Sequence, residues 1–131
     1  TLLDWCQAGT YLADDALYVN VGLPAVRGRA KIVKTLGAMD RPDLDFEVYV
    51  HAIAANGPTV LTERTDAIAV GKMRTQFWVA GRFEVHDGQI TLWRDAFYYL
   101  DVTRAVVRGL LGVVVPSLAP RAPRGDDAPG R

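Results

Sequence analysis

The chain has 131 residues, 50% of them hydrophobic and 23% charged, a composition typical of one soluble domain with a single core. Its 15 basic and 15 acidic residues balance, so no net positive field is present to attract nucleic acid. The apolar run at residues 110–115 is too short to span a bilayer. Cys6 is the only cysteine, which excludes an internal disulfide and favours a reducing, cytoplasmic location.

The first part of the chain predicts helices separated by extended segments. Residues 1–12 have apolar side chains at helical spacing, and residues 29–39 carry an apolar stripe typical of a second helix. Between them, residues 16–21 predict a short strand or extended segment, which ends at Gly22-Leu23-Pro24. Residues 44–55 then alternate between apolar and polar side chains, as a half-buried strand does.

Three further strands are predicted at residues 59–70, 73–85 and 89–100. They follow the turn-forming sequences Asn56-Gly57-Pro58, Gly71-Lys72 and Asp87-Gly88. Residues 102–111 predict a last helix. Residues 116–131 are rich in proline, arginine and glycine, so we expect a poorly ordered tail after a single domain at residues 1–115.

The order of these elements predicts an α+β fold, with helices first and then a meander of four longer strands. A curved, mainly antiparallel sheet with helices over its concave face would enclose a deep apolar pocket. Trp78 lies on the more polar face of its strand, together with Gln76 and Arg82. Two explanations of this outward tryptophan stay open: a second subunit covers it, or its own chain does.

Two strand-like segments carry ionisable groups among apolar neighbours. Because successive side chains of a strand point to opposite faces, Arg64 and Asp66 share a face with Ile68. Asp95 shares a face with Trp93 for the same reason. Charges in such surroundings are costly to bury unless they pair, and they often take part in chemistry.

Several common chemistries lack their sequence motifs. Ser117 is the only serine and no G-x-S-x-G sequence exists, which argues against a serine hydrolase. His51 and His86 are the only histidines, and neither lies in an H-E-x-x-H motif, so we expect no metal site. The chain has no Walker A and no G-x-G-x-x-G sequence, so we expect no nucleotide cofactor.

The polar residues that remain as candidates for a site are Asp66, Asp95, Arg64, Tyr18 and Asn20. Tyr18 and Asn20 are two positions apart, so they share a face if their segment is extended. On spacing alone, two interpretations stay open. These residues carry out chemistry, or an arginine-bridged carboxylate pair has only a structural role.

Four segments together resemble one known family, the limonene-1,2-epoxide hydrolases, and its mycobacterial-type members in particular. These segments are Tyr18-Val19-Asn20, Thr62-Glu63-Arg64-Thr65-Asp66, Gly81 and Trp93-Arg94-Asp95. The resemblance extends over residues 12–100, in the same order and with similar spacing. It implies the cone-shaped α+β fold of the nuclear transport factor 2-like and SnoaL-like superfamily, and a homodimer.

The same resemblance implies a role for each polar residue. Asp66 resembles the general acid that protonates the epoxide oxygen, and Asp95 resembles the general base that takes a proton from water. Arg64 resembles the residue that bridges both carboxylates, while Tyr18 and Asn20 resemble the groups that hold the water. The positions that line the family's apolar pocket correspond to Met39, Ile68, Phe77, Val79, Trp93 and Phe97.

We therefore expect a cofactor-independent epoxide hydrolase that adds water to a small lipophilic epoxide, without a covalent intermediate, and gives a vicinal diol. The chain departs from the family pattern at Ala96 and after Tyr98, which bears on pocket shape and substrate range. Two alternatives stay open: a non-catalytic small-molecule-binding or scaffold domain of the same fold, and an isomerase or cyclase of the ketosteroid-isomerase or SnoaL-like type. An arginine between two aspartates favours hydrolysis, because isomerisation needs a base opposite an oxyanion hole.

Overall fold

The computed structural model describes residues 5–123. Its helices are α1 (Trp5–Gly9), α2 (Arg29–Gly37) and α3 (Tyr99–Val114), followed by the short 3₁₀ helix η1 (Pro116–Leu118). Its strands are β1 (Leu12–Asn20), β2 (Val26–Arg27), β3 (Leu44–Asn56), β4 (Thr59–Val70), β5 (Met73–His86) and β6 (Gln89–Ala96). None of the helices within residues 5–123 combines the length and the apolar character needed to cross a membrane.

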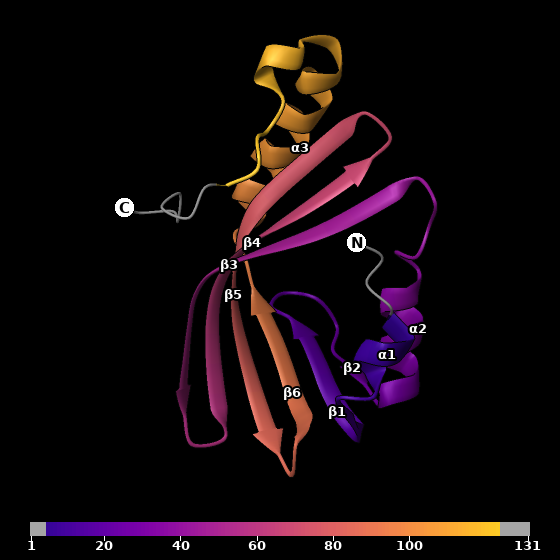
Figure 1. Cartoon of the computed structure of the whole chain (residues 1–131), viewed down its shortest axis with the longest axis vertical. Coiled ribbons are helices and arrows are strands. Elements are labelled where there is room, and N and C mark those ends of the chain that lie inside the picture. The colour runs from indigo at the N-terminus through magenta and orange to yellow at the C-terminus, as the bar shows by residue number, and fades with distance from the viewer. Residues whose placement is uncertain (1–4, 124–131) are drawn as a thin grey trace.

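The six strands form one sheet in the order β2-β1-β6-β5-β4-β3. Strand β1 runs parallel to β6, and every other neighbouring pair is antiparallel. A bulge interrupts the β3–β4 register between Val50 and Ala52, and the long strands bend near their middle (Figure 1). The predicted α+β class with a curved, mainly antiparallel sheet is confirmed.

The hairpin connections explain the register of the meander. Asp87 and Gly88 have φ angles of 51° and 76° and form the two-residue connection between β5 and β6. Positive φ at both central residues is the type I′ pattern, which Asp-Gly sequences adopt readily. Together with the β4–β5 turn at Gly71, this connection fixes which residues of β4 and β6 lie opposite each other across β5.

Helices α1 and α2 lie together on one side of the sheet, beside β1 (Figure 1). Helix α2 buries Ile32 and Leu36, which are four residues apart and therefore share a face. They form the buried core with Leu12, Ala13 and Ala16 of β1. Partly buried residues that pack against this core are Ala8, Tyr18, Val26, Val33, Met39, Phe46, Ile90 and Trp93. The core thus anchors the segments that carry Tyr18, Met39 and Trp93.

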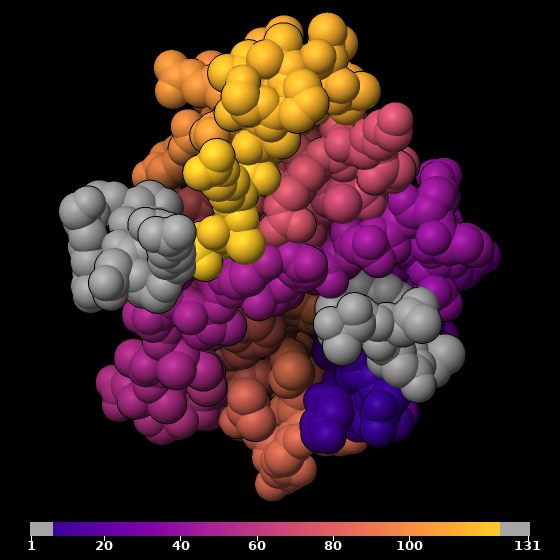
Figure 2. Space-filling view, turned by 45° about the horizontal axis from the view of Figure 1, so that its top comes forward, coloured from indigo at the N-terminus to yellow at the C-terminus, as the bar shows by residue number. Residues whose placement is uncertain are grey.

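Helix α3 packs against β5, and Figure 2 shows it (orange to yellow) at the opposite end of the molecule from α1 (indigo). Its buried positions are Gly109 and Gly112. A Cβ at Gly109 would lie 2.6 Å from the carbonyl oxygen of Arg74, and one at Gly112 would lie 2.7 Å from Cα of Ala119. At Gly109 and Gly112, α3 therefore approaches β5 and the segment at Ala119 more closely than a residue with a side chain would allow.

Some predicted boundaries are wrong. Helix α1 ends at Gly9 and not at residue 12, because Thr10 and Tyr11 form a turn, and Leu12 already pairs with β6. Residues 1–4 of the predicted helix lie outside the described residues. Strand β6 ends at Ala96 instead of residue 100, and the aromatic residues that follow, although typical of strands, lead into α3.

The expectation of a poorly ordered tail is wrong for residues 116–123. Residues Pro116–Leu118 form η1, and Pro120 is buried. The side-chain amide of Gln76 donates a hydrogen bond to the carbonyl oxygen of Arg121 at 2.8 Å. This segment therefore packs on α3 and β5, whereas residues 124–131 lie outside the described part of the chain.

Trp78 makes its contacts within its own chain. Its ring stacks on Tyr98 with centroids 5.9 Å apart and an interplanar angle of 15°. Its Nε1 donates a hydrogen bond to Glu63 at 3.1 Å. An outward tryptophan here needs no second subunit, and the homodimer stays a prediction.

Candidate active site

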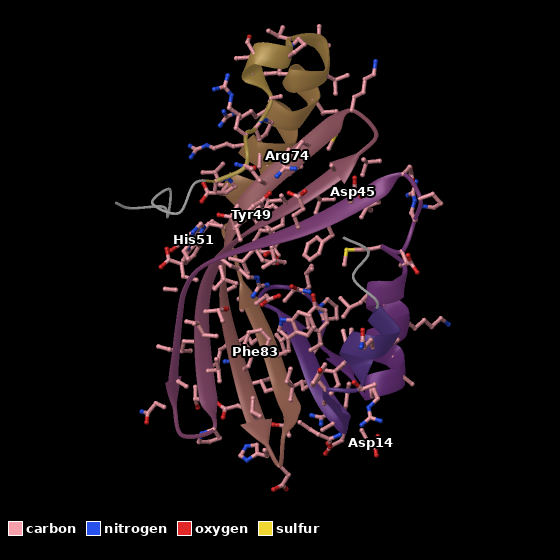
Figure 3. The ribbon with its side chains drawn as sticks, viewed as in Figure 1. Asp14, Asp45, Tyr49, His51, Arg74 and Phe83 are labelled. Carbon is pink, nitrogen blue, oxygen red and sulfur yellow. The ribbon has the colours of Figure 1, made fainter. Side chains whose placement is uncertain are left out.

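A cavity of about 590 Å³ lies between the curved sheet and helices α1 and α2. Its volume is in the range of small-molecule sites. Most lining side chains are apolar or aromatic, including Phe83 of β5, which is labelled in Figure 3. Apart from tyrosines, the polar lining residues are Asn20, Thr62, Arg64, Asp66 and Asp95.

Arg64 bridges Asp66 and Asp95. Its Nε donates to Asp66 Oδ1 at 2.8 Å, while its Nη2 donates to Asp66 Oδ2 at 3.2 Å and to Asp95 Oδ2 at 2.7 Å. Asp66 is two positions beyond Arg64 on β4 and so shares its face, whereas Asp95 comes from β6, two strands away. The bridge that the family resemblance implies is therefore present in the structure.

All three side chains of this bridge are buried, with 5–6% of each residue exposed. Burial alone would lower the pKa of the Arg64 guanidinium, but its hydrogen bonds to Asp66 and Asp95 outweigh this effect and raise the pKa, so Arg64 stays charged. Burial also raises the pKa of the Asp66 carboxyl, although the hydrogen bonds and charge of Arg64 act in the opposite direction. A carboxyl with a raised pKa keeps its proton to higher pH, as a general acid requires.

Asp95 differs from Asp66 in its hydrogen bonding. Both Asp66 oxygens accept from Arg64, whereas Asp95 accepts through Oδ2. Oδ1 of Asp95 is buried and has no hydrogen-bond partner among the described residues. One oxygen of Asp95 is therefore available to accept a proton, as a general base requires.

Strand β1 places Tyr18 and Asn20 next to Asp95. In its parallel register with β6, Tyr18 pairs with Trp93 and Asn20 pairs with Asp95. The rings of Tyr18 and Trp93 lie 4.9 Å apart. Burial raises the pKa of the Tyr18 phenol, although a hydrogen bond with Asn20 acts in the opposite direction. Tyr18 therefore stays protonated at neutral pH and can donate a hydrogen bond into the site.

The cavity brings together every residue that the sequence predicts for the site. Tyr18, Asn20, Arg64, Asp66 and Asp95 all line it. So do the predicted apolar residues Met39, Ile68, Phe77, Val79, Trp93 and Phe97. Their roles in a reaction stay predictions.

Sequence reasoning missed a second set of lining residues: Ala8, Tyr11, Leu12, Leu23, Leu36, Phe46, Val48, Val50, Thr62, Phe83 and Ile90. Periodicity could have found some of them. Phe83 lies on the same strand face as Val79, and Leu36 lies on the same apolar stripe as Met39 in the predicted helix 29–39, although α2 itself ends at Gly37. Val48 and Val50 alternate with polar neighbours on β3, but the alternation does not tell which face turns towards the cavity.

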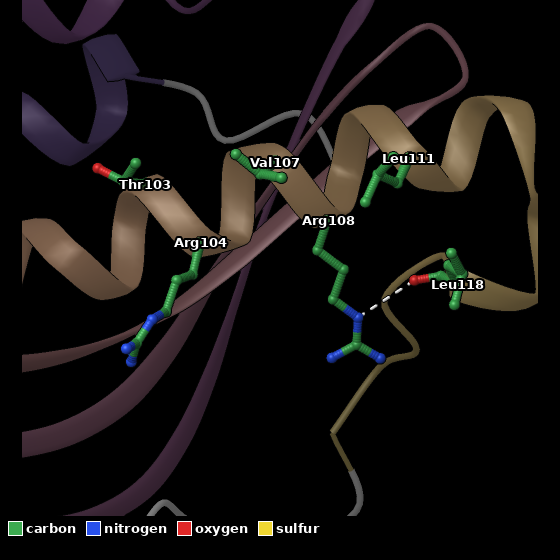
Figure 4. Close-up of a pocket in the computed structure, with 6 residues that line it drawn as sticks. All are labelled: Thr103, Arg104, Val107, Arg108, Leu111 and Leu118. Atoms are coloured by element: carbon green, nitrogen blue, oxygen red, sulfur yellow. Dashed lines mark hydrogen bonds between the residues drawn. The ribbon is translucent and has the colours of Figure 1, made fainter.

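A second cavity, of about 430 Å³, lies beside α3 (Figure 4). Its lining residues are Thr103, Arg104, Val107, Arg108, Leu111 and Leu118. Nε of Arg108 donates to the carbonyl oxygen of Leu118 at 3.1 Å. Among its described lining residues there is no carboxylate, so they offer no acid and base pair like the one between β4 and β6.

A separate polar network lies away from the 590 Å³ cavity, on the other face of β3 and β5 (Figure 3). Nη2 of Arg74 contacts Glu47 Oε2 at 2.9 Å and the Tyr49 hydroxyl at 3.2 Å, and that hydroxyl donates to Glu47. Nε2 of His51 lies 2.8 Å from the hydroxyl of Thr65. Across residues 5–123, no group of three or more histidine, cysteine, aspartate or glutamate side chains is arranged to hold a metal ion.

The comparison with known proteins agrees with this geometry. Residues 2–108 match the family model of the limonene-1,2-epoxide hydrolase catalytic domain. The chain belongs to this family. It is 50% identical over 115 residues to epoxide hydrolase EphG of Mycobacterium tuberculosis, which covers 88% of this chain and 76% of EphG. It is also similar to the solved structure of an M. tuberculosis LEH-like epoxide hydrolase, with a TM-score of 0.84 and 46% identity, over 91% of this chain and 84% of that one.

More distant structures share the fold alone. A Catenulispora acidiphila protein with a ketosteroid isomerase-like fold has a TM-score of 0.70 and 17% identity, over 80% of this chain and 83% of that one. An NTF2-like protein of Burkholderia pseudomallei has a TM-score of 0.67 and 11% identity, over 79% of this chain and 85% of that one. These two structures therefore support the predicted fold, while the choice of reaction depends on the site.

Proposed function

We propose that this protein is an epoxide hydrolase that adds water to a small lipophilic epoxide and releases a vicinal diol. One observation carries the proposal: a buried arginine joins Asp66 and Asp95 inside a mainly apolar cavity. Opening an epoxide at neutral pH needs a proton for the leaving oxygen and a nucleophile for the carbon. Two carboxyl groups in different environments supply both, and the relatives named as epoxide hydrolases support this assignment.

In the proposed reaction, Asp66 gives its proton to the epoxide oxygen as the bond from that oxygen to carbon breaks. A water oxygen attacks the carbon from the opposite side, and Oδ1 of Asp95 accepts the proton that this water loses. One proton leaves Asp66 and one arrives on Asp95 in each cycle. Return of a single proton across the arginine-bridged pair restores the starting state.

Tyr18 and Asn20 are proposed to hold the attacking water. Both line the cavity, and Asn20 is paired with Asp95 in the β1–β6 register. The raised pKa of Tyr18 keeps its phenol protonated, so the hydroxyl can donate to the water oxygen while Asp95 accepts from it. A water fixed in this way loses its rotational and translational freedom before the reaction, which lowers the barrier.

The lipophilic part of the substrate is inferred from the lining. All the charged lining residues belong to the Asp66–Arg64–Asp95 bridge, and the remaining surface is mostly apolar. Exposed apolar side chains, among them Tyr11, Leu23 and Val50, also line the cavity and extend this surface towards solvent. Such a site gains affinity from burying hydrocarbon, and within residues 5–123 it offers no further charged group for a polar substrate.

The test is a diol-formation assay over a panel of hydrocarbon epoxides of increasing size, with the Asp66→Asn/Asp95→Asn double variant as the blank. Diol formation above this blank supports the proposal. If the folded wild-type protein forms no diol from any member, a non-catalytic binding or scaffold role replaces it.

We also propose a homodimer, which sedimentation of the purified protein would reveal as twice the 14.3 kDa chain mass.

A further inference from the structure

Gly81 lies where the Arg64 side chain crosses β5. Strand β5 runs between β4 and β6, so Arg64 has to reach across it to contact Asp95. Adjacent strands are about 4.8 Å apart, so the backbones of β4 and β6 are separated by roughly 10 Å. Gly81 is the β5 residue directly opposite Asp95, and on its other side it pairs with Thr62 of β4.

A side chain at position 81 would occupy the space that the guanidinium uses. An ideal Cβ on Gly81 would lie 2.6 Å from Nη1 of Arg64, 2.4 Å from Oγ1 of Thr62 and 3.0 Å from Cε2 of Phe83. Real Cβ atoms essentially never approach other atoms within 3.0 Å. Gly81 is not among the glycines with positive φ, so its backbone would accept alanine, and the space above it is what requires glycine.

We propose that Gly81 is a positioning residue, whose missing side chain leaves the slot through which Arg64 reaches Asp95. The inference rests on the proposed function, since it assigns Gly81 to the same site. It goes beyond a packing role, because Arg64 contributes a bridge between two groups that are proposed to exchange protons with the substrate and with water.

The hydrogen bonds predict which contact a methyl group at position 81 would break. Asp66 holds the guanidinium through two hydrogen bonds from the same strand. Asp95 holds it through one bond that crosses β5, next to the crowded Nη1 atom. If the guanidinium is displaced, its hydrogen bond to Asp95 therefore breaks first, while the two hydrogen bonds to Asp66 remain.

The expected consequence is a slower reaction rather than weaker substrate binding. Without its cationic neighbour, Asp95 is misplaced and less able to act as the base. The apolar lining that binds the hydrocarbon is largely unchanged, so KM should change little.

The experiment uses a Thr62→Ala background. This change removes the hydroxyl that would lie closest to a Cβ at position 81, so the contact with Arg64 becomes the shortest of the two that remain. We expect Gly81→Ala in this background to lower kcat at least ~10-fold, with KM within ~3-fold of Thr62→Ala alone. Gly37→Ala is the matched control, because nothing lies within 4 Å of a Cβ at that helical position, and it should leave kcat unchanged. An unchanged kcat in folded Thr62→Ala/Gly81→Ala would overturn the proposal.

Two further measurements cover the other outcomes. A crystal structure of the folded double variant should show the Arg64–Asp95 contact lengthened beyond hydrogen-bond distance. An unchanged contact of 2.7 Å would contradict the proposal even if the wild-type protein hydrolyses no epoxide. If the double variant does not fold, adding Arg64→Lys should restore folding, because a lysine ammonium has no atom at the Nη1 position. Failure of this rescue would show that Arg64 is not the obstacle.

Discussion

The guanidinium of Arg64 on β4 lies 2.7 Å from the carboxylate of Asp95 on β6, and it holds Asp66 through two further hydrogen bonds. One positive and two negative charges in a buried site would leave a net negative charge. Burial disfavours such a charge, so a proton shared between the two carboxyl groups is favourable. Burial raises the pKa of Asp66, which favours the proposal that this residue holds the proton.

Asp66→Asn and Asp95→Asn should each lower kcat by at least ~10²-fold, the usual contribution of an acid–base group. Asparagine is nearly isosteric with aspartate, so both variants should fold, which circular dichroism checks. Asp45→Asn is a matched control, because Asp45 is an exposed carboxylate on β3 away from the cavity. A near-normal rate in either folded site variant would favour a purely structural network.

Arg64→Lys should also reduce kcat strongly, because an ammonium group cannot bridge two carboxylates with a planar fork. Stability should fall mainly when the charge itself is removed, because lysine keeps a cation beside the two carboxylates. Removing one partner of a buried ion pair costs roughly 3–5 kcal/mol, and Arg64→Ala should approach this value in denaturant unfolding. Arg41→Lys serves as the control, since Arg41 pairs with Asp43 at the surface. A fully active Arg64→Lys enzyme would remove Arg64 from the mechanism.

Local sequence patterns were sufficient for β3, β4 and β5, and they singled out the polar residues of the site as candidates. Alternation put Arg64 and Asp66 on one face, and the Asp87-Gly88 turn predicted the β5–β6 hairpin. No local rule, however, tells which strands become neighbours. That Asp95 meets Arg64 across β5, and that Asn20 pairs with Asp95 through a parallel contact, are properties of the assembled sheet. The family resemblance supplied this long-range information.

The parts that the sequence misassigned are those that tertiary contacts decide. Residues 97–100 are aromatic and apolar and look like the end of a strand, yet the chain leaves the sheet after Ala96 and α3 begins at Tyr99. The first part of the tail has a composition typical of disorder, but Pro120 is buried and Gln76 binds the backbone at Arg121. In both cases contacts with β5 and α3 outweigh local propensity.

Stability should respond to pH through Asp66 in an unusual direction. Its pKa is raised by burial above the unfolded value of about 3.9, so the folded state binds more protons than the unfolded state between these two pKa values. The free energy of unfolding therefore falls as pH rises through this window. Denaturant titrations should show this loss for the wild type and not for Asp66→Asn. The same slope in both proteins would contradict the assignment.

The catalytic rate should depend on the proton of the Asp66 carboxyl group. Because the proposed acid must be protonated, kcat should fall on the alkaline side as Asp66 loses its proton, at a pH above the ordinary aspartate range. The pH–rate profile of the wild-type enzyme checks this. A rate that stays constant or rises with pH through and beyond that range would show that Asp66 is not the proton donor.

Turnover should survive treatment with a metal chelator. Each proposed step is a proton transfer or an attack by water, and Asp66, Asp95, Tyr18 and Asn20 are assigned to all of them. Chelator-treated and untreated samples should therefore form diol at equal rates. Loss of activity that returns on addition of a metal ion would require a different mechanism.

The source of the new oxygen separates the two ways in which Asp95 can act. As a base, Asp95 takes a proton from water, and the water oxygen enters the diol in the first turnover. As a nucleophile, it would form an ester, and the diol would receive a carboxylate oxygen first. Tyr18 and Asn20 favour the role of Asp95 as a base, because two polar side chains beside Asp95 suit a held water more than direct attack by the carboxylate.

The measurement is a single turnover in ¹⁸O-water with enzyme in excess over epoxide. We expect labelled diol and unlabelled protein. Unlabelled diol, with label in the peptide that contains Asp95, would establish the ester route, because hydrolysis of the ester by labelled water leaves one solvent oxygen in the carboxylate.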